Sequence, residues 1–222
     1  MAFSFSLSLV IFDCDGVLVD TEPVANRALA RFLGECGFEI SYEECRRLFV
    51  GRTMQAVQAH VEDALGRPLG SDWPARIRDE TLKAFAQGIE PVAGAQALLQ
   101  ELAAREKPYC VASSGRFEKM RFTLGATGLL PLVEDVLFSA EEVAQGKPAP
   151  DLFLHAAVRM GHAPENCLVI EDSVPGVQAG VAAGMRVIGY AGDPMTDAAA
   201  LKREGAHVIS DMSALLDLIS FR

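Results

Sequence analysis

Short apolar runs alternate with helical patterns along most of the chain. The apolar runs, which we interpret as β-strands, are residues 9–12, 109–112, 136–138, 168–170 and 186–190. Between them apolar residues recur at helical spacing, in residues 93–105, 116–127, 151–160 and 177–183. Strands that are apolar on both faces and alternate with helices are typical of a parallel sheet covered by helices. The pattern therefore predicts an α/β fold with a parallel-sheet core.

One long segment interrupts this alternation. Between the first and second predicted strands we find no convincing strand pattern, and helical patterns occupy residues 24–35, 42–49, 54–65 and 72–86. We interpret this segment as a helical bundle inserted after the first strand. The predicted organisation is a core formed by residues 1–20 and 90–222, with an inserted helical domain at 21–89.

The composition narrows the range of partners. Half of the 222 residues are hydrophobic, and 30 Asp and Glu against 20 Lys and Arg give a net charge of −10 without any basic run. Nucleic acids and anionic membranes require clustered positive charge, so neither is an expected partner. A small anionic substrate remains compatible, because it responds to the local field and not to the net charge. The oligomeric state is expected to be a monomer or a small homo-oligomer.

The cysteines and the N-terminal segment predict a cytoplasmic protein. The five cysteines are odd in number and show no C-x-x-C spacing, which argues against structural zinc and a disulfide framework. The opening string MAFSFSLSLVIF lacks the basic start and the cleavage site of a secretory signal, and Phe3, Phe5, Leu7 and Leu9 alternate as in a strand. No stretch approaches the roughly 20 apolar residues of a membrane span.

Polar residues follow four of the predicted strands. They are Asp13 and Asp15 after the first strand, Ser113 and Ser114 after the second, Lys147 after the third, and Glu171 and Asp172 after the fourth. Ligands of open parallel sheets bind beyond the carboxyl ends of the strands. Each residue alone has an ordinary explanation as a turn former or a helix cap. Four such strand ends in one chain are much less expected by chance, and together they predict a functional site.

The crowded acids predict a metal site. Carboxylates that share one pocket repel each other, and their pKa values should rise unless a cation lies among them. Mg²⁺ takes oxygen ligands and suits a site beside a phosphate. We expect Asp13, Asp172 and the main-chain oxygen of Asp15 to bind the metal, with Glu171 assisting directly or through water.

With that metal, the residues fit phosphoryl transfer. Asp13 is the expected nucleophile and forms an aspartyl-phosphate, while Asp15 serves as general acid and then as general base. Ser113 is expected to donate a hydrogen bond to a phosphoryl oxygen, and Lys147 to neutralise charge on Asp13 and on the transferring group. Gly16 allows the backbone to bend close to the phosphate, and its amide is a further candidate donor.

These strings resemble the motifs of a known family. DCDGVLVDTE, VASSG, GKPAPD and VIEDSVPG are similar to the four motifs of the haloacid dehalogenase superfamily. A helical insert directly after the first motif resembles the beta-phosphoglucomutase-like branch, in which such an insert is a cap that closes over the substrate. The resemblance implies a Rossmann-like core, Mg²⁺ dependence and an aspartyl-phosphate intermediate. It also implies the roles given above for Asp13, Asp15, Ser113, Lys147 and Asp172.

Individual residues indicate which reaction of this branch to expect. Dehalogenases and phosphonatases lack the second acid, so Asp15 argues against both. Sugar phosphomutases commonly carry a His where this chain has Ala25, and a cap Arg where it has Met54. We therefore expect a phosphatase that hydrolyses a small phosphorylated metabolite, a sugar phosphate above all, with a sugar phosphomutase as the alternative. A distant, non-enzymatic alternative is an aspartyl-phosphate switch similar to a receiver domain, but receivers are about half this length.

The expected substrate contacts include the VGRTM turn of the insert, where Gly51 permits a tight turn and Arg52 and Thr53 could face the substrate. The alternative is a helix start that Thr53 caps and beside which Arg52 is solvated. The other candidates for substrate contact are Ser114, Arg116 and Glu22. Ser114 also has a structural alternative, as the cap of the helix that starts near residue 116.

Overall fold

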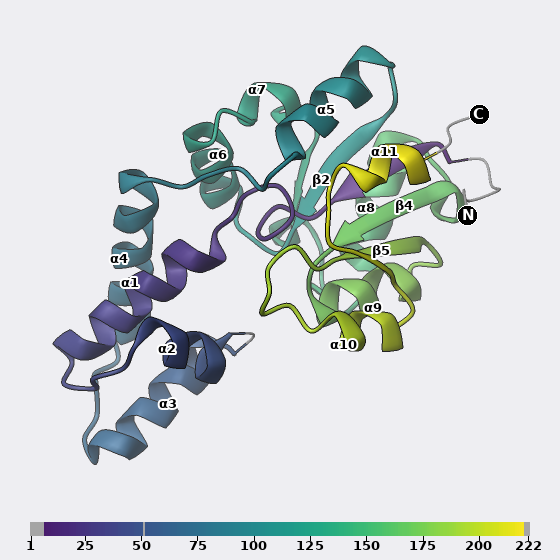
Figure 1. Ribbon diagram of the computed structural model, residues 1–222. Coiled ribbons are helices and arrows are strands. Elements are labelled where there is room, and N and C mark those ends of the chain that lie inside the picture. The colour runs from purple at the N-terminus through teal and green to yellow at the C-terminus, as the bar shows by residue number, and fades with distance from the viewer. Residues whose placement is uncertain (1–6, 51, 220–222) are drawn as a thin grey trace. The chain divides into compact units, whose positions relative to one another are not determined.

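The computed structural model describes residues 7–50 and 52–219. Packing divides the chain into two compact units (Figure 1). One unit contains the described parts of Met1–Asp20 and Glu90–Arg222, and the other is Thr21–Ile89. Phe3, Phe5 and Gly51 lie outside the described residues.

The first unit is built on a six-stranded sheet in the order β3-β2-β1-β4-β5-β6, in which all neighbouring strands are parallel. The strands are β1 (Leu9–Phe12), β2 (Tyr109–Ser113), β3 (Leu137–Ser139), β4 (Cys167–Glu171), β5 (Arg186–Tyr190) and β6 (His207–Ile209). All four residues of β1 are fully buried, as expected for a central parallel strand. Phe12 pairs with Val111 of β2 and with Ile170 of β4. The carboxyl ends of three neighbouring strands therefore meet at one place.

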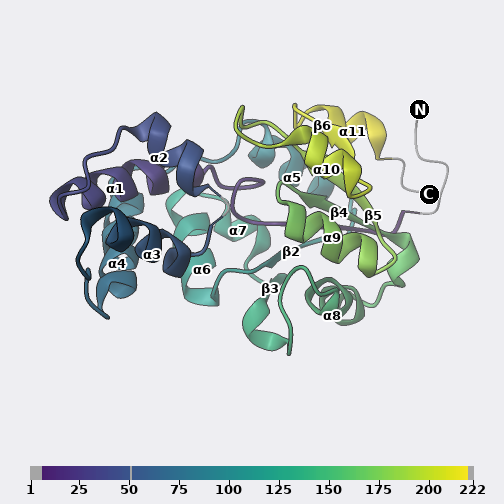
Figure 2. The same cartoon turned by 90° about the horizontal axis from the view of Figure 1, so that it is seen from below.

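Helices cover both sides of this sheet, with α8 on one side and α5 on the other (Figure 2). The helices of this unit are α5 (Ala95–Ala104), α6 (Phe117–Ala126), α7 (Leu130–Val133), α8 (Asp151–Met160), α9 (Val174–Ala182), α10 (Ala198–Arg203) and α11 (Ala214–Leu218), with short 3-10 helices at Ala140–Glu142 and Pro164–Asn166. Such alternation of strands and helices on both faces confirms the predicted α/β fold. None of the helices among the described residues is long and apolar enough to pass through a membrane.

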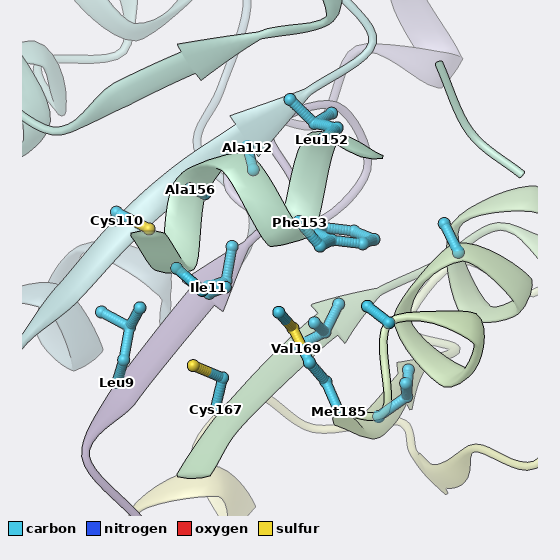
Figure 3. Packing of buried hydrophobic residues seen from close by; sticks show 14 of the residues in the cluster. Leu9, Ile11, Cys110, Ala112, Leu152, Phe153, Ala156, Cys167, Val169 and Met185 are labelled. Atoms are coloured by element: carbon cyan, nitrogen blue, oxygen red, sulfur yellow. The ribbon is translucent and has the colours of Figure 1, made fainter. Parts of the chain in front are cut away.

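The core under α8 and α9 supports the ends of the central strands (Figure 3). Leu9 and Ile11 of β1 pack in one cluster with Phe153 of α8 and Val169 of β4. Gly180 of α9 brings its helix close to the sheet, because a Cβ there would lie 2.7 Å from Cγ2 of Val187. Dense packing of this kind limits movement of the strands, so residues at their ends are held in fixed positions.

The strand predictions were correct for the central strands and incomplete at the edge. The observed bounds of the five predicted strands differ by at most one residue at each end. The edge strand β6 was not predicted, because it has only three residues and only Ile209 among them is buried. The short helices α7, α10 and α11 were missed as well, since four to six residues carry too little periodicity to read.

The second unit is helical, and its described residues contain no strand. Its helices are α1 (Glu22–Glu35), α2 (Tyr42–Phe49), α3 (Met54–Leu65) and α4 (Trp73–Gln87). Trp73 is fully buried in the apolar core of this unit, with its ring centroid 6.0 Å from that of Phe32. Ser41 and Glu44 form a capping box at the start of α2. The core and the caps together explain why this stretch folds as a helical bundle.

Candidate active site

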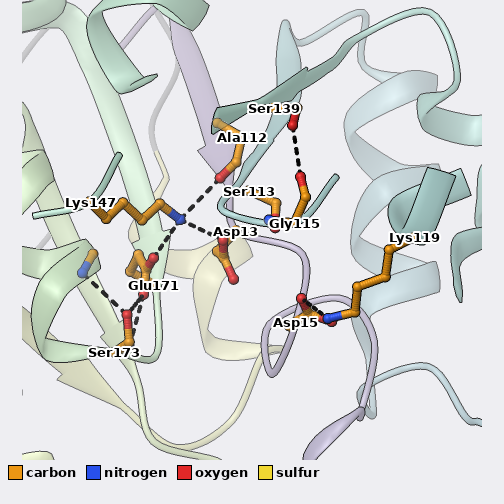
Figure 4. Close-up of polar contacts among 11 residues, drawn as sticks. Asp13, Asp15, Ala112, Ser113, Gly115, Lys119, Ser139, Lys147, Glu171 and Ser173 are labelled. Carbon is orange, nitrogen blue, oxygen red and sulfur yellow. Dashed lines mark hydrogen bonds and ion pairs between the residues drawn. The ribbon is translucent and has the colours of Figure 1, made fainter. Parts of the chain in front are cut away.

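Asp13 lies directly after the central strand and is held by its backbone and its side chain. Its amide donates to the Ile170 carbonyl of β4 over 2.9 Å, which continues the sheet by one residue. Oδ1 of Asp13 accepts a hydrogen bond of 2.5 Å from Nζ of Lys147 (Figure 4). Asp13 itself is buried, so this carboxylate is fixed against the end of the sheet.

Lys147 joins the ends of three strands. Besides Asp13, its ammonium donates to the Ala112 carbonyl of β2 over 3.1 Å and to Oε1 of Glu171 in β4 over 2.7 Å. A lysine ammonium has three donors, so these acceptors use all of them. Burial disfavours the charged ammonium, but Asp13 and Glu171 outweigh that effect and raise the pKa of Lys147 well above its ordinary value. Lys147 therefore stays a cation at neutral pH.

Glu171 is almost completely buried and uses both carboxylate oxygens. Oε1 accepts from Lys147, while Oε2 accepts from the amide and the hydroxyl of Ser173, both over 2.8 Å. The Ser173 hydroxyl also accepts from the Gly176 amide and thereby caps α9. Only glycine fits there, since a Cβ at Gly176 would lie 1.8 Å from Glu171 Oε1. Protein donors thus already surround Glu171, and its expected role in metal binding stays a prediction.

The two buried acids Asp13 and Glu171 share one cation, Lys147. Burial raises the pKa of Asp13 to about 7, and the nearby Glu171 and Asp15 also raise it, while Lys147 lowers it. A single lysine therefore does not offset the burial of this carboxylate. Further positive charge beside Asp13 would favour its ionised form.

A second lysine of the site contacts Asp15. Its Oδ2 accepts a hydrogen bond of 2.7 Å from Nζ of Lys119, which lies in the first turn of α6 (Figure 4). Burial disfavours the charged ammonium, but Asp15 raises the pKa of Lys119 above its ordinary value. Lys119 was not among the residues predicted from the sequence. Its position carried a usable signal, because a cation in the first turn opposes the helix dipole and so suggests an acidic partner.

Ser113 lies in a turn that is fastened to two strands. The residue is buried at the end of β2, and its hydroxyl accepts from the Gly115 amide over 3.1 Å. The Ser139 hydroxyl of β3 donates to the Gly115 carbonyl over 2.8 Å. A Cβ at Gly115 would lie 3.4 Å from Ser113 Oγ and 3.8 Å from Asp15 Oδ2. The Ser113 and Asp15 side chains therefore approach the same face of Gly115.

Ser114 does not cap the following helix, so that interpretation was wrong. The N-cap position of α6 belongs to Arg116, which makes no side-chain cap bond. Instead Glu141 accepts from the Phe117 amide over 3.2 Å and from Nε of Arg116 over 2.8 Å. An acid from the loop after β3 replaces the local serine cap, which no local pattern could predict. Ser114 and Arg116 are both exposed.

Asp172 lies against the backbone of the loop after β1. Gly16 has φ +77°, and a Cβ there would lie only 2.0 Å from Oδ2 of Asp172. Glycine is thus required twice, for its left-handed backbone and for the space that the carboxylate occupies. The Gly16 amide donates to the Val19 carbonyl over 2.8 Å. Our expectation that this amide contributes to anion binding was therefore wrong, because the loop already uses it.

The oxygen atoms at this end of the sheet fit a Mg²⁺ ion whose remaining ligands are water and phosphate oxygens. Among residues 7–50 and 52–219 no three His, Cys, Asp or Glu side chains form a ready-made metal site. Mg²⁺ is commonly held by one or two carboxylates and completed by water and substrate oxygens. The carboxylate of Asp172 fills the space above Gly16, which follows Asp15 in the loop that Asp13 begins. These oxygens are of the type and number that such a site needs.

The candidates in the helical unit have mainly structural contacts. Thr53 accepts from the Ala56 amide over 3.2 Å and caps α3, which confirms the helix-start alternative for this residue. Arg52 is exposed, as that alternative also requires. Glu22 accepts from Nδ2 of Asn26 over 2.8 Å within α1. Whether Arg52, Thr53 or Glu22 contacts a substrate stays a prediction.

The chain is similar in sequence to proteins of one known family. Residues 7–184 match the family described as haloacid dehalogenase-like hydrolase. The 6-phosphogluconate phosphatase of Escherichia coli K12 is 35% identical over 189 residues, which are 85% of this chain and 84% of that protein.

Two solved structures resemble almost the whole chain. A haloacid dehalogenase-like protein of unknown function from Agrobacterium tumefaciens superposes with a TM-score of 0.85 at 34% identity, covering 96% of this chain and 97% of that one. A candidate beta-phosphoglucomutase from Thermotoga maritima gives a TM-score of 0.82 at 26% identity, covering 95% and 97%. The likeness therefore extends over both units of the chain.

Proposed function

The chain belongs to the haloacid dehalogenase-like hydrolases, and from this premise we propose that it is a Mg²⁺-dependent phosphatase of a small phosphomonoester, namely a sugar phosphate. The observation that carries the proposal is the contact of Asp13 with Lys147 at the end of the central strand. Ser113 ends β2 and Asp172 comes directly after β4, the two strands that flank β1. The likeness to a 6-phosphogluconate phosphatase supports a sugar or sugar acid as the group that carries the phosphate.

In the proposed first step Asp13 attacks phosphorus. Lys147 holds Oδ1 of Asp13, so the other carboxylate oxygen is the attacking atom. A bond forms between this oxygen and phosphorus, and the bond from phosphorus to the substrate oxygen breaks. Asp15 donates its proton to that leaving oxygen, which departs as an alcohol.

In the second step Asp15 acts as a base. It takes a proton from a water molecule whose oxygen attacks phosphorus, and the bond between phosphorus and Asp13 breaks. Inorganic phosphate leaves, and both carboxyl groups return to their starting protonation states. The same residue can serve both steps, because the first leaves it as the carboxylate that the second requires.

The groups around Asp13 offset the negative charge of the phosphate and the carboxylates. In this proposal the Ser113 hydroxyl donates to a phosphoryl oxygen, and Lys147, whose donors are already used, offsets negative charge on Asp13 and on the transferring group through its positive charge. Asp13, Asp172 and the main-chain oxygen of Asp15 would hold Mg²⁺, which supplies positive charge that offsets repulsion between phosphate and carboxylates. In this proposal Glu171 keeps Lys147 in place and binds the metal through water at most.

The helical unit, in this proposal, selects the substrate as a cap. The family resemblance of the insert supports this role, and the exposed Arg52 is its best candidate for a substrate contact. Thr53 and Glu22 are weaker candidates because each already makes a contact within a helix. Arg52→Ala should raise KM for a sugar phosphate while leaving hydrolysis of a phosphomonoester without a sugar unchanged.

Phosphate release from a panel of sugar phosphates and sugar acid phosphates tests the function. Release should require Mg²⁺, stop with EDTA and be absent in Asp13→Asn. A folded wild-type protein that releases no phosphate from any member with Mg²⁺ present would contradict the proposal.

A sugar phosphomutase is the second candidate, favoured by the likeness to the candidate mutase of Thermotoga maritima. Ala25 and Met54, which replace the expected His and Arg, argue against it. Phosphorus NMR of the products separates the two functions. A mutase yields an isomerised sugar phosphate and requires a bisphosphate activator, whereas a phosphatase yields inorganic phosphate.

A further inference from the structure

The contact between Lys119 and Asp15 is not explained by the four motifs at the strand ends. Lys119 belongs to α6, 104 residues from Asp15, and its ammonium reaches Oδ2 over 2.7 Å. The side chains are partly buried, with exposed fractions of 37% for Lys119 and 27% for Asp15. The contact therefore ties α6 to the loop after β1 at the rim of the sheet.

The two carboxylate oxygens of Asp15 have different surroundings. Oδ2 is held by Lys119, whereas Oδ1 is buried and has no hydrogen-bond partner among the described residues. A buried carboxylate oxygen without a donor is unfavourable in a resting protein and needs an explanation. An oxygen that gives a proton to a substrate, or takes one from water, would have its partner only during the reaction.

The contact also fixes where this carboxylate lies. Oδ2 of Asp15 approaches the same face of Gly115 as the hydroxyl of Ser113. Gly115 is in turn held by Ser139. Lys119 therefore keeps the carboxylate beside the turn that is proposed to receive the phosphoryl group.

Local preferences alone do not account for a lysine at this position. Lys119 lies in the first turn of α6, where the helix dipole disfavours a cation. The acid on the same turn, Glu118, is exposed. Lys119 instead contacts an acid from a different segment, which favours a role tied to Asp15.

We propose that Lys119 is a positioning residue for proton transfer: it holds Oδ2 of Asp15 and leaves Oδ1 directed to the substrate or water oxygen. The inference rests on the proposed phosphatase function. Lys119 itself contacts neither the phosphoryl group nor the leaving group. Without it, the Asp15 carboxylate rotates among several orientations, and only some of them place Oδ1 for transfer.

The test compares leaving groups that do and do not need a proton. The variants are Lys119→Met and the conservative Lys119→Arg, with Arg121→Met as a control that removes an exposed cation from the same helix. The substrates are the best sugar phosphate of the panel and p-nitrophenyl phosphate, whose leaving group departs without protonation. The parameter is kcat/KM, because it covers only the steps up to release of the leaving group.

Positioned general acids contribute about 10²–10⁴-fold to rate, so misplacing one should lose part of that factor. We expect Lys119→Met to lower kcat/KM about 10-fold or more for the sugar phosphate and less than about 2-fold for p-nitrophenyl phosphate. Lys119→Arg should restore most of the loss, and Arg121→Met should match wild type. Asp15→Asn with Lys119→Met should be no slower than Asp15→Asn alone, since the lysine acts through Asp15.

Three results would overturn the proposal. An equal loss for both substrates would show that Lys119 contacts the phosphoryl group. An unchanged kcat/KM for both would show that the contact has no role in the reaction, and an additive double variant would show that it does not act through Asp15. Absence of Mg²⁺-dependent turnover in wild type is a separate outcome, which would contradict the proposed function and this inference with it.

Discussion

Two lysine–carboxylate clusters lie at the rim of the sheet, and they differ in depth. The deep cluster consists of Lys147 with Asp13 and Glu171, and its lysine side chain is 5% exposed. The shallow cluster consists of Lys119 with Asp15, and its lysine side chain is 37% exposed. The deep lysine has three acceptors at the ends of three strands, whereas among the described residues the shallow lysine has one acceptor, Asp15. The same two residue types therefore serve different purposes.

Burial decides what each cluster contributes. Removing one partner of a buried ion pair leaves an uncompensated charge, which destabilises by about 3–5 kcal/mol. Fully exposed pairs contribute about 0.2–1 kcal/mol, because water replaces the lost partner, and a pair that water partly reaches should lie nearer to this range. The deep cluster should therefore affect folding and reaction together, and the shallow cluster mainly the reaction. Substitutions in each cluster test this division.

The largest expected effect is on turnover, from a substitution in the deep cluster that keeps its shape. Asp13→Asn removes the proposed nucleophile and should lower kcat on the order of 10⁴-fold or more. Lys147 retains Glu171 and Ala112 as acceptors, so the fold should persist. Circular dichroism checks the fold and Mg²⁺-dependent phosphate release checks the activity. Near-normal turnover would exclude Asp13 as the nucleophile.

Lys147→Met should lower stability as well as activity. Without the ammonium, Asp13 and Glu171 lose their shared buried cation, and the free energy of unfolding should fall by about 3–5 kcal/mol. Urea denaturation in EDTA, at one pH for all variants, measures the change. A loss below about 1 kcal/mol would show that the deep cluster is no more structural than an exposed pair.

Gly16→Ala affects the loop that joins the two clusters. The left-handed backbone should destabilise the variant by about 1–3 kcal/mol, and the new methyl group should displace Asp172. Gly161→Ala is a matched control, because it has the same φ of +77° and nothing within 4 Å of the new Cβ. Calorimetric titration with Mg²⁺ should show weaker binding in Gly16→Ala only. Equal affinities in both variants would argue against Asp172 as a metal ligand.

Ser173→Ala removes a support of the deep cluster without removing a charge. The hydroxyl bond to Glu171 and the cap of α9 disappear, while the Ser173 amide still donates to Glu171. We expect a loss of about 1–2 kcal/mol, which thermal denaturation can measure. A loss as large as that of Lys147→Met would mean that the hydroxyl, and not the charge balance, dominates the cluster.

The smallest expected change in stability comes from the shallow cluster. Lys119→Met should alter the free energy of unfolding by less than about 1 kcal/mol, even though it slows hydrolysis of the sugar phosphate. Urea denaturation beside Lys147→Met makes the comparison direct. A loss of several kcal/mol would remove the distinction between the two clusters.

Much of the site could be predicted because its residues follow strands. A parallel sheet brings the carboxyl ends of its strands to one edge, so Asp13, Ser113, Lys147 and Asp172 could be grouped without knowledge of the strand order. The central strands were also readable, since they are apolar on both faces.

The rest depended on contacts between distant segments. Lys119 finds its acid 104 residues away, and Glu141 caps a helix that begins 24 residues before it. The position of Lys119 suggests an acidic partner but does not identify it, and the partner in neither contact follows from local spacing, because the rotation of α6 about its axis is set by packing. The use of the Gly16 amide was hidden for a similar reason, as it depends on how the following turn closes onto Val19.

The chain leaves and re-enters the sheet unit at adjacent points. The Asp20 amide donates to the Glu90 carbonyl over 3.0 Å, and the Val92 amide donates to the Leu18 carbonyl over 2.9 Å. Because these hydrogen bonds already join the two backbone segments, the insert does not have to hold them at a set distance. An insert of another length or architecture can start and finish at these positions while the sheet keeps its register. If the helical unit selects the substrate as proposed, the sheet unit could therefore be recombined with other inserts of different specificity, in evolution or by grafting in the laboratory.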